Sequence, residues 1–100
     1  MTPEGEIKRA IFMLLQKRKI FCWNNQSVGV FDPVRRCYRK NNGIGSMNGV
    51  ADILGILPNG RFLAIEVKSK KGVVSPVQKD FLRAINELGG LAFVARSVVD

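Results

Sequence analysis

The chain has 100 residues, 46% of them hydrophobic, and its 16 Lys and Arg against 8 Asp and Glu give a formal net charge of +8. The length predicts one domain with a small core, and the charge favours a polyanionic partner, nucleic acid first and an anionic membrane surface second. The chain has no histidine, which excludes Ser-His-Asp catalysis, Cys-His catalysis and His-containing zinc sites.

The first predicted element is an amphipathic helix. Thr2 is placed to cap it, Pro3 follows at the first helical position, and apolar residues recur at three- and four-residue spacing between residues 7 and 15. A short strand is expected over residues 20–23, and two shorter strand pieces over residues 28–31 and 36–39. The loop expected at residues 40–49 leads into the next segment.

A hairpin is predicted at the centre of the chain. Asp52 opens one apolar segment, and Glu66 and Lys68 lie in the second, residues 62–68. Strand side chains alternate between faces, so Glu66 and Lys68 project from one side together with Ala64. The sequence Leu-Pro-Asn-Gly-Arg between the segments is typical of a reverse turn, which brings Asp52 back towards Glu66. Two carboxylates and an ammonium group can hold a divalent cation and handle a proton beside it, as in a nuclease site.

An acid and a lysine two residues apart on a strand most often form a weak surface ion pair. Here, however, Glu66 and Lys68 interrupt an apolar strand, and Asp52 sits between apolar residues. Charges in such places are costly to desolvate unless they are paired or bound to metal. This context favours the functional interpretation.

The chain ends with a second helix and a last strand. A turn is expected at residues 70–72, and Ser75 is placed to cap a helix with Pro76 at its first position, which Gly89-Gly90 ends. Residues 91–95 read as a buried strand. The order α-β-β-β-α-β predicts one α/β domain with a mixed sheet.

Two cysteines, Cys22 and Cys37, are too few for a disulfide scaffold or a zinc site, and they fit the reduced thiols of a cytoplasmic protein. No apolar run reaches the roughly 18 residues of a membrane span, and the start of the chain lacks the pattern of a signal peptide.

Asp52, Glu66-x-Lys68 and the predicted element order together resemble the PD-(D/E)XK nuclease superfamily, whose fold is that of restriction endonucleases. Four stretches, residues 2–5, 49–55, 60–68 and 75–78, are more narrowly similar to the VRR-NUC (virus-type replication-repair nuclease) family. Ala51 stands where the superfamily pattern has proline, a minor departure because the carboxylate carries the chemistry. The resemblance implies one VRR-NUC domain over residues 1–100, of the stand-alone phage type, acting in the cytoplasm of a bacterial host.

The expected chemistry is phosphodiester hydrolysis, which needs an activated water and neutralisation of charge in the transition state. A cation bound by Asp52 and Glu66 supplies both, and oxygen ligands suit Mg²⁺ or Mn²⁺ rather than Zn²⁺. The resemblance implies the backbone carbonyl of Val67 as a further ligand. Lys68 can orient the water, stabilise charge or act as a base.

Two further candidates each have a structural alternative. Glu4 can simply compensate the dipole of the first helix, but it matches the family's first-helix acid, so we expect it at the metal and among the catalytic residues, with Glu6 as the fallback. Gln78 can close a capping box with Ser75, or it can point into the active site as in the family, and the sequence leaves both open.

The remaining basic residues suggest a DNA-contacting surface before Asp52 and after Glu66. Trp23 and Tyr38 can stack on bases, although packing in the core is the expectation for Trp23. The residues expected to contact DNA are Arg35, Arg36, Arg39, Lys40, Lys70 and Lys71.

We therefore expect a metal-dependent, structure-selective DNA endonuclease that acts at branched DNA such as four-way (Holliday) junctions. The alternatives are a non-catalytic basic nucleic-acid-binding module and a restriction or nicking enzyme with the same chemistry. A homodimer is expected, because a symmetric junction requires two nicks related by a two-fold axis. Its interface is expected on the first helix or around residues 91–94.

Overall fold

The computed structural model describes residues 2–25, 30–32, 37–39 and 47–100, and the side chains within residues 2–25 and 47–100. No helix in this described part of the chain is long and apolar enough to span a membrane. The elements are α1 (Pro3–Lys17), β1 (Phe21–Asn24), β2 (Val30–Asp32), β3 (Cys37–Arg39), β4 (Ile53–Ile56), β5 (Phe62–Val67), α2 (Pro76–Glu87) and β6 (Leu91–Ala95).

The main sheet has the strand order β1-β4-β5-β6. The pairs β1–β4 and β4–β5 are antiparallel, whereas β5 and β6 run parallel and are connected through α2. This is the predicted α/β domain with a mixed sheet. The two short strands expected before Asp52 are β2 and β3, which pair with each other in a separate two-stranded sheet.

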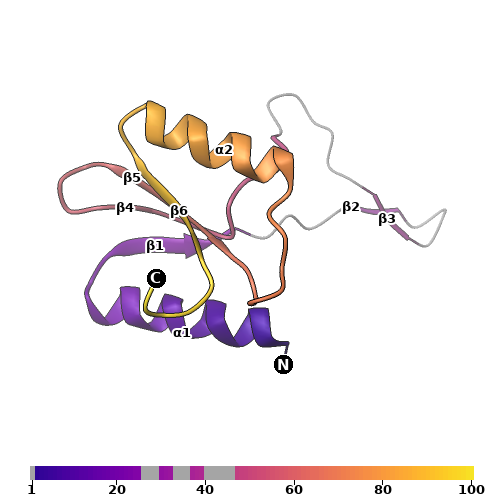
Figure 1. The fold of residues 1–100 in the computed structure, drawn as a ribbon, viewed down its shortest axis with the longest axis horizontal. Helices are drawn as coiled ribbons and strands as arrows, with labels where there is room; N and C mark the ends of the chain where they lie inside the picture. Colours follow the sequence, from indigo (N-terminus) through magenta and orange to yellow (C-terminus); the bar gives the residue numbers. More distant parts are fainter. Residues whose placement is uncertain (1, 26–29, 33–36, 40–46) are drawn as a thin grey trace.

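The two helices lie on opposite sides of the main sheet (Figure 1). Both N-termini are capped as the sequence predicts. Thr2 Oγ1 accepts a hydrogen bond from the Gly5 amide at 3.1 Å, and Ser75 caps α2, with proline at the start of each helix. These caps satisfy amides that have no partner within the helix.

The core is divided by the sheet into two layers, as the alternation of strand side chains requires. On the α1 side, buried Ile11 packs with Leu63, Ile65 and Val67 of β5. On the α2 side, Leu82 packs with small side chains that include Ala64 and with Leu54. The small residues let α2 approach the strands, and the predicted division of β5 into two faces is confirmed.

The β4–β5 turn has the predicted chemistry. Gly60 has a φ of +89°, a conformation that glycine adopts without strain, and Asn59 Oδ1 accepts a hydrogen bond from the Arg61 amide at 3.0 Å. The Leu57 amide donates to the Arg61 carbonyl at 2.8 Å and closes the hairpin. The turn thereby fixes the register that determines which residue of β5 lies opposite Asp52.

Candidate active site

The hairpin register brings Asp52 and Glu66 together at one end of the sheet. Ile53 pairs with Ile65, so Asp52, one residue earlier, lies beside Glu66 on the antiparallel neighbour. The Asn25 amide donates to the Asp52 carbonyl at 2.7 Å, which extends the hydrogen bonding between β1 and β4 as far as Asp52. Asp52 and Glu66 thus face each other on the side of the sheet that α2 covers.

Asp52 is held by the backbone of β5. Its Oδ2 accepts a hydrogen bond from the Val67 amide at 2.9 Å. A carboxylate that accepts a backbone N–H in a partly buried place is fixed in orientation, and the bond is stronger than one between neutral groups.

Glu66 is the one charged residue among the buried side chains of the described residues, with 2% of its surface exposed. Burial raises its pKa from the ordinary 4.5 to about 8, and the adjacent Asp52 contributes through its negative charge and a hydrogen bond. Glu4 also raises the pKa, and Lys68 lowers it, with Lys68 Nζ 3.8 Å from Glu66 Oε1. Two acids in a site with little water and one nearby cation cannot easily both be ionised.

Gln78 fulfils both roles that the sequence left open. Its Oε1 accepts from the Ser75 amide at 2.9 Å, and Ser75 Oγ accepts from the Gln78 amide at 3.2 Å, which completes the capping box. Its Nε2 donates to Glu66 Oε1 at 3.2 Å. Because the cap fixes the amide oxygen, the NH₂ group is preorganised to orient the Glu66 carboxyl group.

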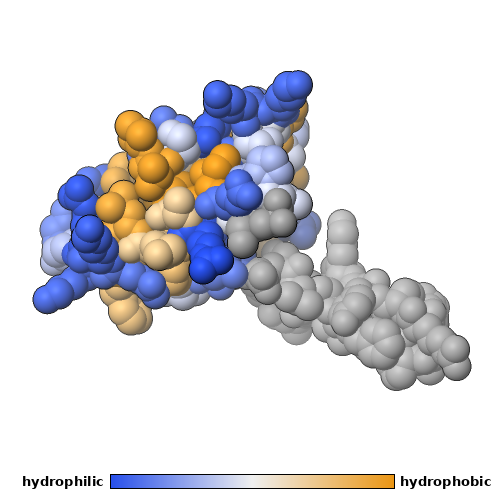
Figure 2. Space-filling view, turned by 90° about the horizontal axis from the view of Figure 1, so that it is seen from below, coloured by the Kyte–Doolittle hydropathy of each residue, from blue (hydrophilic) through white to orange (hydrophobic). Residues whose placement is uncertain are grey.

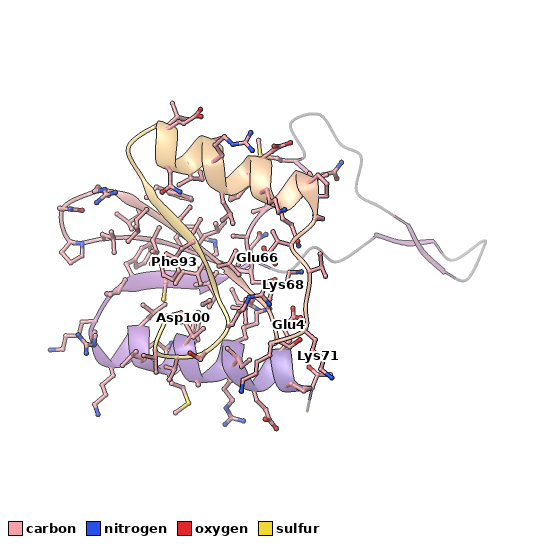
Figure 3. The ribbon with its side chains drawn as sticks, in the orientation of Figure 1. Glu4, Glu66, Lys68, Lys71, Phe93 and Asp100 are labelled. Atoms are coloured by element: carbon pink, nitrogen blue, oxygen red, sulfur yellow. The ribbon has the colours of Figure 1, made fainter. Side chains whose placement is uncertain are left out.

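Lys68 directly follows the last residue of β5, and it is half-buried. Its amide donates to the Ala95 carbonyl of β6 at 3.0 Å. A Cβ placed on Gly72 would lie 3.3 Å from both Cβ and Cδ of Lys68, so glycine permits the loop after β5 to pass against this side chain. The side chains of Glu66 and Lys68 lie together on the inner side of that loop (Figure 3).

Arg96 is a site-supporting residue that sequence reasoning missed. Its Nη1 donates to the carbonyls of Ser69 at 2.7 Å and Gly72 at 2.8 Å, with a longer contact to Lys70 at 3.4 Å. One guanidinium group therefore holds the loop that carries Lys68 into α2. The sequence offers only a weak signal for this role, a basic residue directly after the last buried strand.

Glu4 lies in the first turn of α1, near enough to Glu66 to influence its pKa (Figure 3). It lines a hollow of about 520 Å³ together with Thr2, Lys8 and Ser69. Glu6 is exposed on the same turn. Within the described residues, no group of three His, Cys, Asp or Glu side chains is placed to hold a metal ion, so a metal role for Glu4 remains a prediction.

The expected DNA-contacting residues are described only in part. Lys70 and Lys71 are exposed on the loop between β5 and α2. Arg35, Arg36 and Lys40 lie outside the described residues, as do the side chains of Arg39 and Tyr38.

Two other expectations concern β1. Cys22 is a free thiol, and burial raises its pKa. Trp23 is not a core residue, because 38% of its surface is exposed. Its strand lies at the edge of the sheet, where α2 does not cover it, and the expectation of core packing is therefore wrong.

The donor set at the site fits a hard divalent cation. Asp52 and Glu66 offer carboxylate oxygens side by side, and burial first and the charge of Asp52 second raise the pKa of Glu66, so a negative charge on Glu66 is poorly compensated. Asp52 and Glu66 would hold such a cation, which would compensate their negative charge, and all-oxygen ligands suit Mg²⁺ or Mn²⁺.

A mixed sheet with helices on both sides, with two acids and a lysine at the end of its central hairpin, defines a nuclease domain of the PD-(D/E)XK, restriction-endonuclease-like class. Residues 2–99 match the VRR-NUC domain, and the chain belongs to that family. Membership in this family makes the protein a nuclease, a hydrolase whose substrate is DNA. A comparison with curated proteins finds no match to this chain.

Proposed function

We propose that the protein is a metal-dependent, structure-selective DNA endonuclease that cuts branched DNA, such as four-way junctions. The observation that carries this proposal is the buried carboxyl group of Glu66 beside Asp52, with Lys68 Nζ 3.8 Å away. A buried acid beside a second, partly buried acid costs stability unless the two bind something positive. The family supplies the reaction class, and the acid pair supplies a place for the cation.

Asp52 and Glu66 are the proposed ligands of Mg²⁺ or Mn²⁺, with the Val67 carbonyl and Glu4 as further candidates. When bound, the cation polarises the phosphate and lowers the pKa of a water molecule. Gln78 keeps the Glu66 carboxyl group in one orientation through its hydrogen bond. Lys68 remains beside that carboxyl group, where its ammonium group can orient the attacking water or neutralise developing charge.

The proposed substrate selectivity rests on charge and on the small size of the domain. A net charge of +8 in 100 residues favours contacts to phosphates, which position DNA without reading its sequence. Lys70 and Lys71 are exposed on the loop that follows Lys68, which places positive charge next to the acids. An enzyme of this kind recognises the shape of DNA rather than a base sequence.

A homodimer is the proposed working unit, because two nicks in a symmetric junction require two sites. Because residues 11–15 are all apolar, α1 carries apolar side chains both on the face that packs on the sheet and outside that face. Met13 is one that is exposed. The view from the α1 side shows an apolar area among hydrophilic side chains (Figure 2). We place the interface there. A phage origin and action in the cytoplasm of a bacterial host complete the proposal, as the resemblance implies.

The test is incubation of the protein with end-labelled four-way junction, flap and linear duplex DNA, each with Mg²⁺, Mn²⁺ or EDTA. The proposal predicts cleavage of branched DNA with either cation, no cleavage in EDTA and little cleavage of the duplex. Binding of all three DNAs without cleavage under any condition would support the non-catalytic binding module instead. Equal cleavage of duplex and branched DNA would point to a restriction or nicking enzyme.

A further inference from the structure

Part of the sheet face that carries the acids, along β1 and at the turn end of β4, is left uncovered by α2. The helix packs over β5 and β6, and on β1 and β4 of the same face three large side chains are exposed. These are Phe21 with 68%, Trp23 with 38% and Ile56 with 43% of their surface accessible. The rings of Phe21 and Trp23 meet edge to face, with centroids 5.8 Å apart, and we call the three side chains the aromatic platform.

The strand register places the platform next to the acids. Trp23 pairs with Leu54, and Leu54 pairs with Ala64. Asp52 and Glu66 are each two residues from this row, towards the same end of the sheet, so their side chains rise from the same face as Trp23. Rows two residues apart are separated by about 7 Å along the strands, and neighbouring strands by about 4.8 Å. Trp23 is therefore about one nucleotide length from Asp52, which is on the neighbouring strand, and further from Glu66, which is two strands away. The side chain of Cys22, one residue before Trp23, points to the other face of β1. It packs on the α1 side, which confirms this assignment of faces.

We propose that the aromatic platform stacks an unpaired base of the DNA substrate, one nucleotide away from the phosphate that is cut. The proposal deepens the proposed nuclease function and rests on it for the identity of the ligand. A base offers a flat apolar face of the size of the Trp23 ring, and stacking on aromatic side chains is tolerant of base identity. The neighbouring acids and the net charge of +8 make a DNA strand the fitting occupant.

A second copy of the chain is the other candidate occupant of this face. Three side chains are a small area compared with the roughly 800 Å² that each partner buries in a standard protein interface. Position also favours DNA, because the platform lies on the sheet face from which Asp52 and Glu66 project, whereas the proposed interface between copies lies on α1.

The platform predicts a substrate preference within branched DNA. In a fully paired duplex, every base is stacked on its neighbours and cannot reach the protein. At a flap, a fork or a bulge, an unpaired base is free to leave the stack at little cost. The nuclease should therefore favour branched structures with an unpaired base beside the cut over a linear duplex.

Trp23 is the single tryptophan of the chain, so its fluorescence reports on the platform directly. The wild-type protein is titrated in EDTA with flap DNA, and with the same flap in which the nucleotides next to the branch lack their bases. We expect quenching by the intact flap and little quenching by the abasic flap, because both carry the same phosphates. Trp23→Leu should bind the intact flap about 5- to 150-fold more weakly, the range for one stacked base, and the abasic flap as the wild type does. Leu88→Ala, at an exposed residue outside the platform, is the matched control and should bind both flaps unchanged.

Equal quenching by the two flaps, or equal affinities of wild type and Trp23→Leu for the intact flap, would overturn the proposal. A fluorescence change with protein concentration in the absence of DNA would also overturn it, since a second copy would then cover Trp23. Cleavage is measured separately with Mg²⁺, so that failure of the platform proposal can be distinguished from failure of the proposed nuclease function. Cleavage without base-dependent quenching would contradict the platform proposal alone. Base-dependent quenching without cleavage under any cation would contradict the nuclease function and support the platform proposal.

Discussion

Replacement of Glu66 by glutamine should change how the stability of the metal-free protein depends on pH. The pKa of Glu66 is raised from 4.5 to about 8 in the fold, so between these values the folded chain holds a proton that the unfolded chain releases. The free energy of unfolding should therefore fall as the pH rises from 4.5 to about 8. Glu66→Gln is neutral at every pH, and its side chain can still accept from Gln78 and donate to Asp52.

The magnitude follows from the size of the shift. The difference between about 8 and 4.5 is about 3.5, and each pKa unit corresponds to 1.36 kcal/mol. Ionising Glu66 in the fold thus costs on the order of 5 kcal/mol when no cation is bound. This is a large part of the stability of a small domain. The free energy of unfolding of Glu66→Gln should equal that of the wild type near pH 4.5 and exceed it by several kcal/mol above pH 8.

The assay is urea denaturation in EDTA, followed by far-UV circular dichroism at a series of pH values. Glu87→Gln, which removes an exposed carboxylate at the other end of α2, is the control and should follow the wild type. Addition of Mg²⁺ at pH 8 should stabilise the wild type and leave Glu66→Gln unchanged. If the free energies of unfolding of wild type and Glu66→Gln changed with pH in the same way across the whole range, this reasoning would be refuted.

Other substitutions separate chemistry, positioning and DNA binding. Asp52→Asn keeps the hydrogen bond to β5 but removes a charge, and cleavage should fall by about 100-fold or more while DNA affinity is retained, as measured by single-turnover kinetics and fluorescence anisotropy. Gln78→Ala loses the side-chain half of the capping box and the bond to Glu66 but keeps the bond from its backbone amide to Ser75, so unfolding experiments should show a loss of about 1 kcal/mol, and kcat should fall more than KM rises. Arg96→Gln should lower kcat at unchanged DNA affinity and cost about 1–3 kcal/mol, since three carbonyls lose their donor. Lys71→Gln should reduce the slope of log K against log[salt] by about one if that side chain contacts one phosphate, and an unchanged slope would exclude the contact.

Most of the fold follows from local sequence patterns. Thr2-Pro3 and Ser75-Pro76 predict the helix starts because capping and the fixed φ of proline act within a few residues. The Asn-Gly turn and the alternating pattern of β5 predict the hairpin register, and the register alone is enough to bring Asp52 to Glu66. The features that depend on neighbours within four or five residues were therefore predictable.

The features that depend on distant contacts were not. Arg96 reaches carbonyls 24 to 27 residues away, and no periodicity marks such a contact. The sequence places Trp23 in the core because large aromatic residues are usually buried, yet strand order, which the sequence does not specify, leaves β1 at an edge that α2 does not cover. The sequence allows Gln78 to be either a capping residue or a site residue, and only the three-dimensional arrangement shows that one side-chain amide does both.

The central claim is that a cation held by Asp52 and Glu66 supports DNA cleavage. Its most direct test is the single-turnover cleavage rate of end-labelled flap DNA in Mn²⁺ by wild type and by Glu66→Gln, at protein concentrations that saturate the DNA for both. The account predicts equal DNA binding, cleavage by the wild type that stops in EDTA, and a rate for Glu66→Gln at least about 100-fold lower. Cleavage by Glu66→Gln at the wild-type rate would contradict the account, because the site would then work without the charge on which the proposed cation depends.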